Sequence, residues 1–98
     1  MTLKLTDEQI AAALAALPGW SLANGKLHRE YQFRDFVHAF GFMATAAVAI
    51  EARNHHPEWS NVWNRVTVDL TTHDAQGITE KDTSLAAFLE SVATRLLG

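Results

Sequence analysis

The sequence contains no cysteine, two prolines and one tyrosine among its 98 residues. Without cysteine the chain can form no disulfide, no thiolate metal site and no thiol nucleophile. The absence fits a reducing compartment, so we expect a cytoplasmic protein.

Clusters of basic residues are also missing. The 8 Lys and Arg are outnumbered by 11 Asp and Glu, and the formal net charge is −3. Nucleic-acid binding through counterion release needs clustered Lys and Arg, so we expect no nucleic-acid partner.

Long apolar runs are absent as well. The N-terminus, "MTLKLTDEQI", lacks the apolar stretch of a signal peptide, and the longest apolar stretch, "AFGFMATAAVAI", is too short to span a bilayer. We therefore expect no membrane partner. With 48% hydrophobic residues the chain can still bury one small core, which predicts a single domain over residues 1–98.

The first third of the sequence predicts a helix and a hairpin. "TDEQ" at 6–9 has the form of a capping box, and it precedes apolar residues at helical spacing: Ile10, Leu14 and Leu17. "PG" at 18–19 then ends the helix. Asn24-Gly25 is typical of a type I′ turn, so we expect two strands near residues 20–33.

A second helix is predicted from the cap Asp35 to about His55, because Pro57 disfavours helical geometry at His56. The hydrophobic period becomes two from Val62 to His73, which predicts a strand with one buried face. "TEKD" at 79–82 starts a third helix. This order indicates an α+β fold with helices on one face of an antiparallel sheet. Three strands are evident, and a fourth, poorly marked in the sequence, could follow the strand at 62–73.

Several polar residues lie at predicted element ends, where side chains can converge on a cleft. They are Glu51, His55, His56, His73 and Asp82. Trp59 and Trp63 lie between them in sequence and offer flat apolar walls that suit a planar heterocycle.

Each of these residues also has a simpler interpretation. Asp82 could only complement the helix dipole, His55 could bind the last carbonyls of its helix, and Trp63 could belong to the core. Three imidazoles and a carboxylate could alternatively hold zinc, but no H-x-x-x-H spacing exists. The sequence contains no G-x-S-x-G elbow, the motif that would indicate a serine nucleophile.

The site residues form one pattern by their spacing in the sequence, and further segments over most of the chain belong to the same pattern. Flanking segments that follow the same pattern are "GW" at 19–20, "RDFVHAFGFM" at 34–43, "HHPEWSNVWNRV" at 55–66, "TTH" at 71–73 and "GITEKD" at 77–82. Together they resemble the pterin-4a-carbinolamine dehydratases, over about residues 14–96. One departure is Asn54, where some relatives carry Asp.

The resemblance implies a four-stranded antiparallel sheet with three helices packed on one face, the fourth strand coming from near residues 20–33. It implies dehydration of 4a-hydroxytetrahydropterin to quinonoid dihydropterin, which recycles the pterin cofactor of aromatic amino-acid hydroxylases, without a metal or organic cofactor. The implied catalytic residues are His55, His56 and His73. The implied substrate-binding residues are Glu51, Trp59, Trp63, Thr72 and Asp82.

Two alternatives to this enzyme remain open. Mammalian relatives also act as dimerisation cofactors of a homeodomain transcription factor, and some divergent relatives are non-catalytic assembly modules. A metal-dependent hydrolase is the other alternative. The sequence does not say which histidine is the acid and which is the base.

The helix predicted at 35–55 is apolar nearly all round, unlike the surface helix of a monomer. Even the stripe with His38, Phe42, Thr45, Ala46 and Ala49 is too apolar for solvent. We therefore expect a homodimer or homotetramer in which this helix packs against its copy, with Phe42 in the contact.

Overall fold

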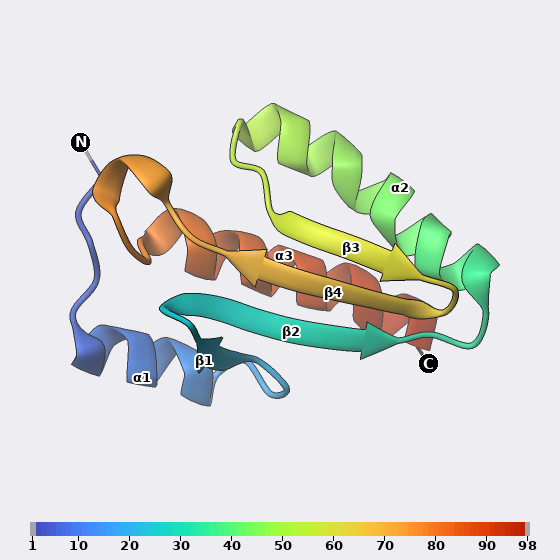
Figure 1. The fold of residues 1–98 in the computed structure, drawn as a ribbon, viewed down its shortest axis with the longest axis horizontal. Coiled ribbons are helices and arrows are strands. Elements are labelled where there is room, and N and C mark those ends of the chain that lie inside the picture. The colour runs from blue at the N-terminus through green and yellow to red at the C-terminus, as the bar shows by residue number, and fades with distance from the viewer. Residues whose placement is uncertain (1, 98) are drawn as a thin grey trace.

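Four antiparallel strands form one open sheet, in the order β1-β2-β4-β3. The computed structural model describes residues 2–97, and Figure 1 shows the helices around the sheet. The chain passes through α1 (Asp7–Ala15), β1 (Ser21–Ala23), β2 (Lys26–Gln32), α2 (Phe36–Arg53), β3 (Glu58–Val62), β4 (Arg65–Leu70), the short 3-10 helix η1 (His73–Ala75) and α3 (Glu80–Leu97). The predicted α+β fold is confirmed.

The local signals in the first third of the chain act as predicted. Thr6 and Gln9 form a reciprocal capping box at the start of α1. The turn between β1 and β2 has φ of 54° at Asn24 and 75° at Gly25, the positive values that a type I′ turn requires.

The second helix ends earlier than predicted. Asn54, with φ 51° and ψ 41°, is the left-handed residue that terminates α2, and its N–H donates to the Glu51 carbonyl. Asn is one of the few residues that adopt this conformation at low cost. His55 therefore follows the helix and is not on its last turn.

The position of the fourth strand was also predicted wrongly. It is β3, which precedes β4, and it does not come from residues near 20–33. The long alternation at 62–73 is broken by a turn at Trp63 and Asn64, where Trp63 has φ 50°. No Gly marks this turn, so the alternation continues across it in the sequence and conceals the hairpin.

The core lies between the inner face of the sheet and the helices α2 and α3. α3 contacts β2, while α2 contacts both α3 and β4, so the two helices share one face of the sheet. Side chains that β2 and β4 bury there include Leu27, Tyr31, Val66, Val68 and Leu70. From α3 they meet Leu85, Ala86, Leu89 and Ala93.

Phe42 belongs to this core, which contradicts its predicted place in a contact between subunits. Its side chain is 0% exposed within one chain. The ring lies 5.1 Å from the ring of Tyr31 and 5.2 Å from that of Phe33, measured between centroids. The face of α2 that packs on the sheet therefore consists of Ala39, Phe42, Ala46 and Ile50.

The opposite face of α2 is exposed and still apolar. Val37 is 74%, Phe40 56% and Val48 76% exposed, and Ala44 and Ala47 between them are exposed too. These five residues, with Phe36, are called the outer face of α2. By length and composition α2 is the one described helix that could cross a membrane, but its other face packs in the core.

Truncating Phe42 should destabilise the fold, whereas truncating the exposed Leu3 should not. Phe42→Ala removes a buried ring from the core and should lower the free energy of unfolding by about 3–5 kcal/mol. Leu3→Ala is the control, since Leu3 is 75% exposed and lies outside both the core and the outer face of α2. Urea unfolding at one protein concentration measures both, and equal losses would contradict the burial of Phe42 in the core.

The start of α2 depends on a charged cap. Asp35 accepts a hydrogen bond from the backbone N–H of His38 at 2.9 Å and contacts the ring Nδ1 of His38 at 2.6 Å. The side-chain hydrogen bond from His38, followed by the backbone one, lowers the pKa of Asp35 below its ordinary value. The ionised form is thus favoured by folding.

The stability that the Asp35 charge provides should be lost in acid. Because its pKa is lower in the folded chain, the contribution is complete above the ordinary pKa near 3.8 and disappears as pH falls through the folded value. Asn also caps helices, so Asp35→Asn isolates the charge. Urea unfolding should show wild type more stable than Asp35→Asn at neutral pH, with a smaller difference at about pH 3. A difference that grows in acid would contradict this assignment.

Candidate active site

Three segments that are distant in sequence meet at one end of the sheet. β3 and β4 are antiparallel, and Glu58 at the start of β3 pairs with Asp69 near the end of β4. Figure 1 shows the end of α2, the start of β3 and the end of β4 together there, beside the start of α3. The loops at this end carry the three predicted catalytic histidines.

Asp82 and His55 form the more buried of the two pairs that join a predicted catalytic histidine to a carboxylate. Asp82 lies in the first turn of α3 and is 0% exposed. Its Oδ1 lies 2.6 Å from Nε2 of His55, whose side chain is 13% exposed. A buried carboxylate needs such partners, because an unpaired charge is costly away from water. The structure therefore joins two of the predicted residues.

The second oxygen of Asp82 is bound by two threonines. Oδ2 accepts from the hydroxyl of Thr72 at 2.8 Å and from the backbone N–H of Thr79 at 2.9 Å. The two threonine hydroxyls are 2.7 Å apart. Thr72, predicted to bind substrate, thus directs its hydroxyl toward Asp82.

Thr79 was not among the predicted site residues. It directly precedes α3, and the carboxylate three positions later binds its backbone N–H, which is half of a capping box. The "TEKD" motif does contain this signal. A cap, however, shows only where a helix starts, and the contact between the Thr79 hydroxyl and Thr72 depends on how the loop folds back.

His56 pairs with a different acid. Its Nε2 lies 3.2 Å from Oε1 of Glu51, and the two side chains are 58% and 80% exposed. An ion pair this exposed holds its members weakly. His55 and His56 therefore leave the end of α2 toward different partners, and His56 stays open to a bound molecule.

His73 is the first residue of η1 and is exposed. Among the hydrogen bonds and ion pairs of residues 2–97, none joins it to the other predicted site residues. Its neighbour Thr72 is the residue that binds Asp82. His73 is thus placed near the pair of His55 and Asp82 by the chain, with no hydrogen bond or ion pair to either among the described residues.

The two tryptophans lie apart. Trp59 is half-buried and meets the ring of Phe42 at 6.4 Å, so it contributes to the core. Trp63 is 64% exposed in the turn at the other end of β3. This strand of five residues, roughly 16 Å long at about 3.3 Å per residue, therefore lies between Trp63 and the histidines.

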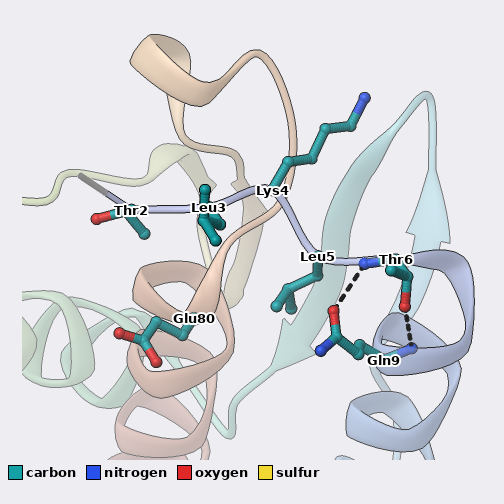
Figure 2. A pocket seen from close by; sticks show the side chains of 7 residues that line it. All are labelled: Thr2, Leu3, Lys4, Leu5, Thr6, Gln9 and Glu80. Atoms are coloured by element: carbon teal, nitrogen blue, oxygen red, sulfur yellow. Dashed lines mark hydrogen bonds between the residues drawn. The ribbon is translucent and has the colours of Figure 1, made fainter.

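No histidine lines either of two surface pockets formed by residues 2–97. One of about 530 Å³ lies between the N-terminal segment and the start of α3, lined by residues 2–6, Gln9 and Glu80 (Figure 2). Another, of about 320 Å³, is lined by Thr2, Thr72, Asp74, Ala75 and Lys81. Only Thr72 belongs to the predicted site. The polar contacts of Asp82, and not these hollows, therefore define the candidate site.

Chemically, the cluster offers two imidazoles with carboxylate partners and a third imidazole on the adjacent loop. Imidazoles exchange protons near neutral pH, so such a cluster can act as both acid and base. Within residues 2–97, no three His, Asp or Glu side chains are arranged to hold a metal ion.

Comparison with known proteins gives the family. The model of the family "Pterin 4 alpha carbinolamine dehydratase" matches residues 3–92. The chain belongs to this family. The histidine cluster is thus the candidate active site of a chain with the fold and sequence of the pterin-4a-carbinolamine dehydratases.

Individual relatives agree with the family model. A protein of Solibacter usitatus is 61% identical over 93 residues, which cover 95% of this chain and 98% of the relative. One of Prochlorococcus marinus is 54% identical over 82 residues, covering 84% and 85%. Both are named "Putative pterin-4-alpha-carbinolamine dehydratase".

A solved structure shares the fold. It is described as a transcriptional coactivator/pterin dehydratase from Brucella melitensis, and it superposes with a TM-score of 0.88 at 44% sequence identity. The match covers 92% of this chain and 98% of that one. The dehydratase family and its fold are therefore shared over nearly the whole chain.

Proposed function

We propose that this protein dehydrates 4a-hydroxytetrahydropterin to quinonoid dihydropterin, and so returns the pterin cofactor of aromatic amino-acid hydroxylases to use. The observation that carries the proposal is the pairing of His55 with the buried Asp82 at the sheet end where His56 and His73 also lie. Membership of the family supplies the substrate class.

The reaction needs one acid and one base. The 4a-hydroxyl leaves as water after an acid protonates its oxygen. A base takes the proton from the adjacent ring nitrogen, and the electron pair of that N–H bond forms the new C=N bond. Imidazoles suit both steps at neutral pH, and no metal or organic cofactor is required.

The residues divide between these tasks. We assign His55, His56 and His73 to proton transfer. Glu51, exposed beside His56, would contact the pterin or orient that imidazole.

The absence of cysteine and the reducing compartment that it suggests support a cytoplasmic location.

Purified protein should accelerate carbinolamine dehydration above its spontaneous rate without added metal. Replacing His56 or His73 by Ala should lower the catalysed rate by about 10²-fold or more if each transfers a proton. His28→Ala is the matched control, because His28 also pairs with a carboxylate, Asp69 at 2.8 Å, but on the outer face of the sheet. A stopped assay of carbinolamine disappearance measures all of them.

Other results would select a different function. Full activity of the His56→Ala, His73→Ala double variant would overturn the catalytic assignment. Activity that a chelator abolishes and zinc restores would favour a metal-dependent hydrolase. A wild-type protein with no activity would favour a non-catalytic binding or assembly module.

We also propose that the protein is a homodimer or homotetramer assembled through α2. The outer face of α2 supports this proposal, since it exposes four large apolar side chains along one side of one helix: Phe36, Val37, Phe40 and Val48. Ala44 and Ala47 between them would let a second helix approach closely. Each large apolar side chain that becomes fully buried would contribute about 1.5–3 kcal/mol.

A charge on the outer face should separate the subunits. Phe40→Glu and Val48→Glu would each bury a carboxylate in the contact, so both should sediment as smaller species than wild type. Leu3→Glu is the control, because Leu3 is 75% exposed but lies in the N-terminal segment. A wild-type protein that sediments as a monomer at micromolar concentration would refute the proposed assembly.

A further inference from the structure

The hydrogen bonds around Asp82 can run in only one direction. Thr79 Oγ1 accepts the backbone N–H of Lys81 at 3.2 Å. The single hydroxyl proton of Thr72 points at Asp82 Oδ2. The 2.7 Å contact between the two hydroxyls must therefore use the proton of Thr79, so that Thr79 donates to Thr72 and Thr72 donates to Asp82.

This chain of donors ends on an acceptor. Oδ2 of Asp82 receives two donors, the Thr72 hydroxyl and the Thr79 N–H. Thr72, Thr79 and Asp82 are 6%, 0% and 0% exposed, so water cannot easily replace any of these bonds. A group so surrounded by donors suits a carboxylate, which only accepts hydrogen bonds.

The remaining oxygen then decides the proton position on His55. Oδ1 lies 2.6 Å from Nε2, and a carboxylate oxygen there can only accept. The proton of a neutral His55 must be on Nε2, which leaves Nδ1 unprotonated. Glu51 does not fix the tautomer of His56 in this way. The distance between His56 Nε2 and Glu51 Oε1 is longer, and both side chains are mostly exposed.

We infer that Thr72 and Thr79 are positioning residues which, through Asp82, hold neutral His55 as the Nε2–H tautomer and make Nδ1 the base. The role of His55 Nδ1 as the base in the reaction rests on the proposed function. Nδ1 takes the proton of the pterin ring nitrogen, and the resulting imidazolium is stabilised by Asp82 and later releases the proton to solvent. The protonation of the leaving hydroxyl then falls to His56 or His73.

The tautomer can be observed without any substrate. Long-range ¹H–¹⁵N spectra of the imidazoles, with His55 assigned by comparison with His55→Gln, report which nitrogen carries the proton. In wild type, neutral His55 should be protonated on Nε2. A neutral ring protonated on Nδ1, or a ring that stays doubly protonated wherever the protein is folded, would overturn the inference.

Asp82→Asn gives the sharpest test, because it should move the proton. The amide oxygen must face the Thr79 N–H and the Thr72 hydroxyl, so the amide NH₂ would face His55. Nε2 would then accept, and the proton would shift to Nδ1. An unchanged tautomer in Asp82→Asn would show that the threonines do not set the direction of these bonds.

The threonines are tested by removing and restoring the hydroxyl. Thr72→Val keeps the shape of the side chain but not the donor, and it should weaken the preference for Nε2–H and lower the dehydration rate by about 10–100-fold. Thr72→Ser should restore both. Thr67→Val on the outer face of β4 is the matched control. If Thr72→Val fails to fold, the spectra of wild type and Asp82→Asn still decide.

The two proposals fail separately. Spectra that show the expected tautomers in a protein without dehydratase activity would leave the positioning role intact and refute the enzyme. An active protein in which Thr72→Val matches wild type in both rate and tautomer would refute the positioning role alone.

Discussion

The candidate site depends on one buried carboxylate. Asp82 is fully buried, and its partners come from three segments: the loop after α2, the loop after β4, and the residue before α3. A buried charge is tolerated only when it is hydrogen-bonded, so these segments must be in place together. The site therefore forms only when the tertiary fold is complete.

A second acid on α3 has a comparable role farther along the helix. Glu90 lies eight residues after Asp82, slightly more than two turns farther along the helix. It accepts from Trp20 Nε1 at 3.0 Å and from the Tyr31 hydroxyl at 2.7 Å. Burial, followed by Glu90, raises the pKa of Tyr31 well above its ordinary value, which keeps the phenol a donor. Through Asp82 and Glu90, α3 thus accepts hydrogen bonds from both the candidate site and the sheet.

The helix α2 shows how an apolar sequence can serve two surfaces. Its inner residues, Phe42 among them, complete the core of one chain. Its outer face is nearly as apolar and is uncovered in that chain. Composition alone does not separate these faces, because an error of one position in the helical stripe moves a residue by about 100° around the axis. For this reason the sequence pattern assigns Phe42 to the wrong surface.

Local sequence signals determined most of the elements. Thr6, Asp35 and the Asn24-Gly25 turn each act through neighbours a few residues away, so their roles can be predicted without the fold. The end of α2 and the hairpin before β4 were missed because Asn54 and Trp63 take positive φ values without glycine.

The candidate site, like the fold, was determined partly by the sequence and partly only by the tertiary structure. The sequence by itself determined which residue types were available, namely His55, His56, His73, Glu51 and Asp82, and their spacing placed the chain near its family. Only the tertiary structure decided that Asp82 pairs with His55 while Glu51 pairs with His56. It also brought in Thr79 and turned Thr72 toward Asp82. The physical reason is that burial and hydrogen-bond direction arise when separate segments pack together, and no single segment carries them.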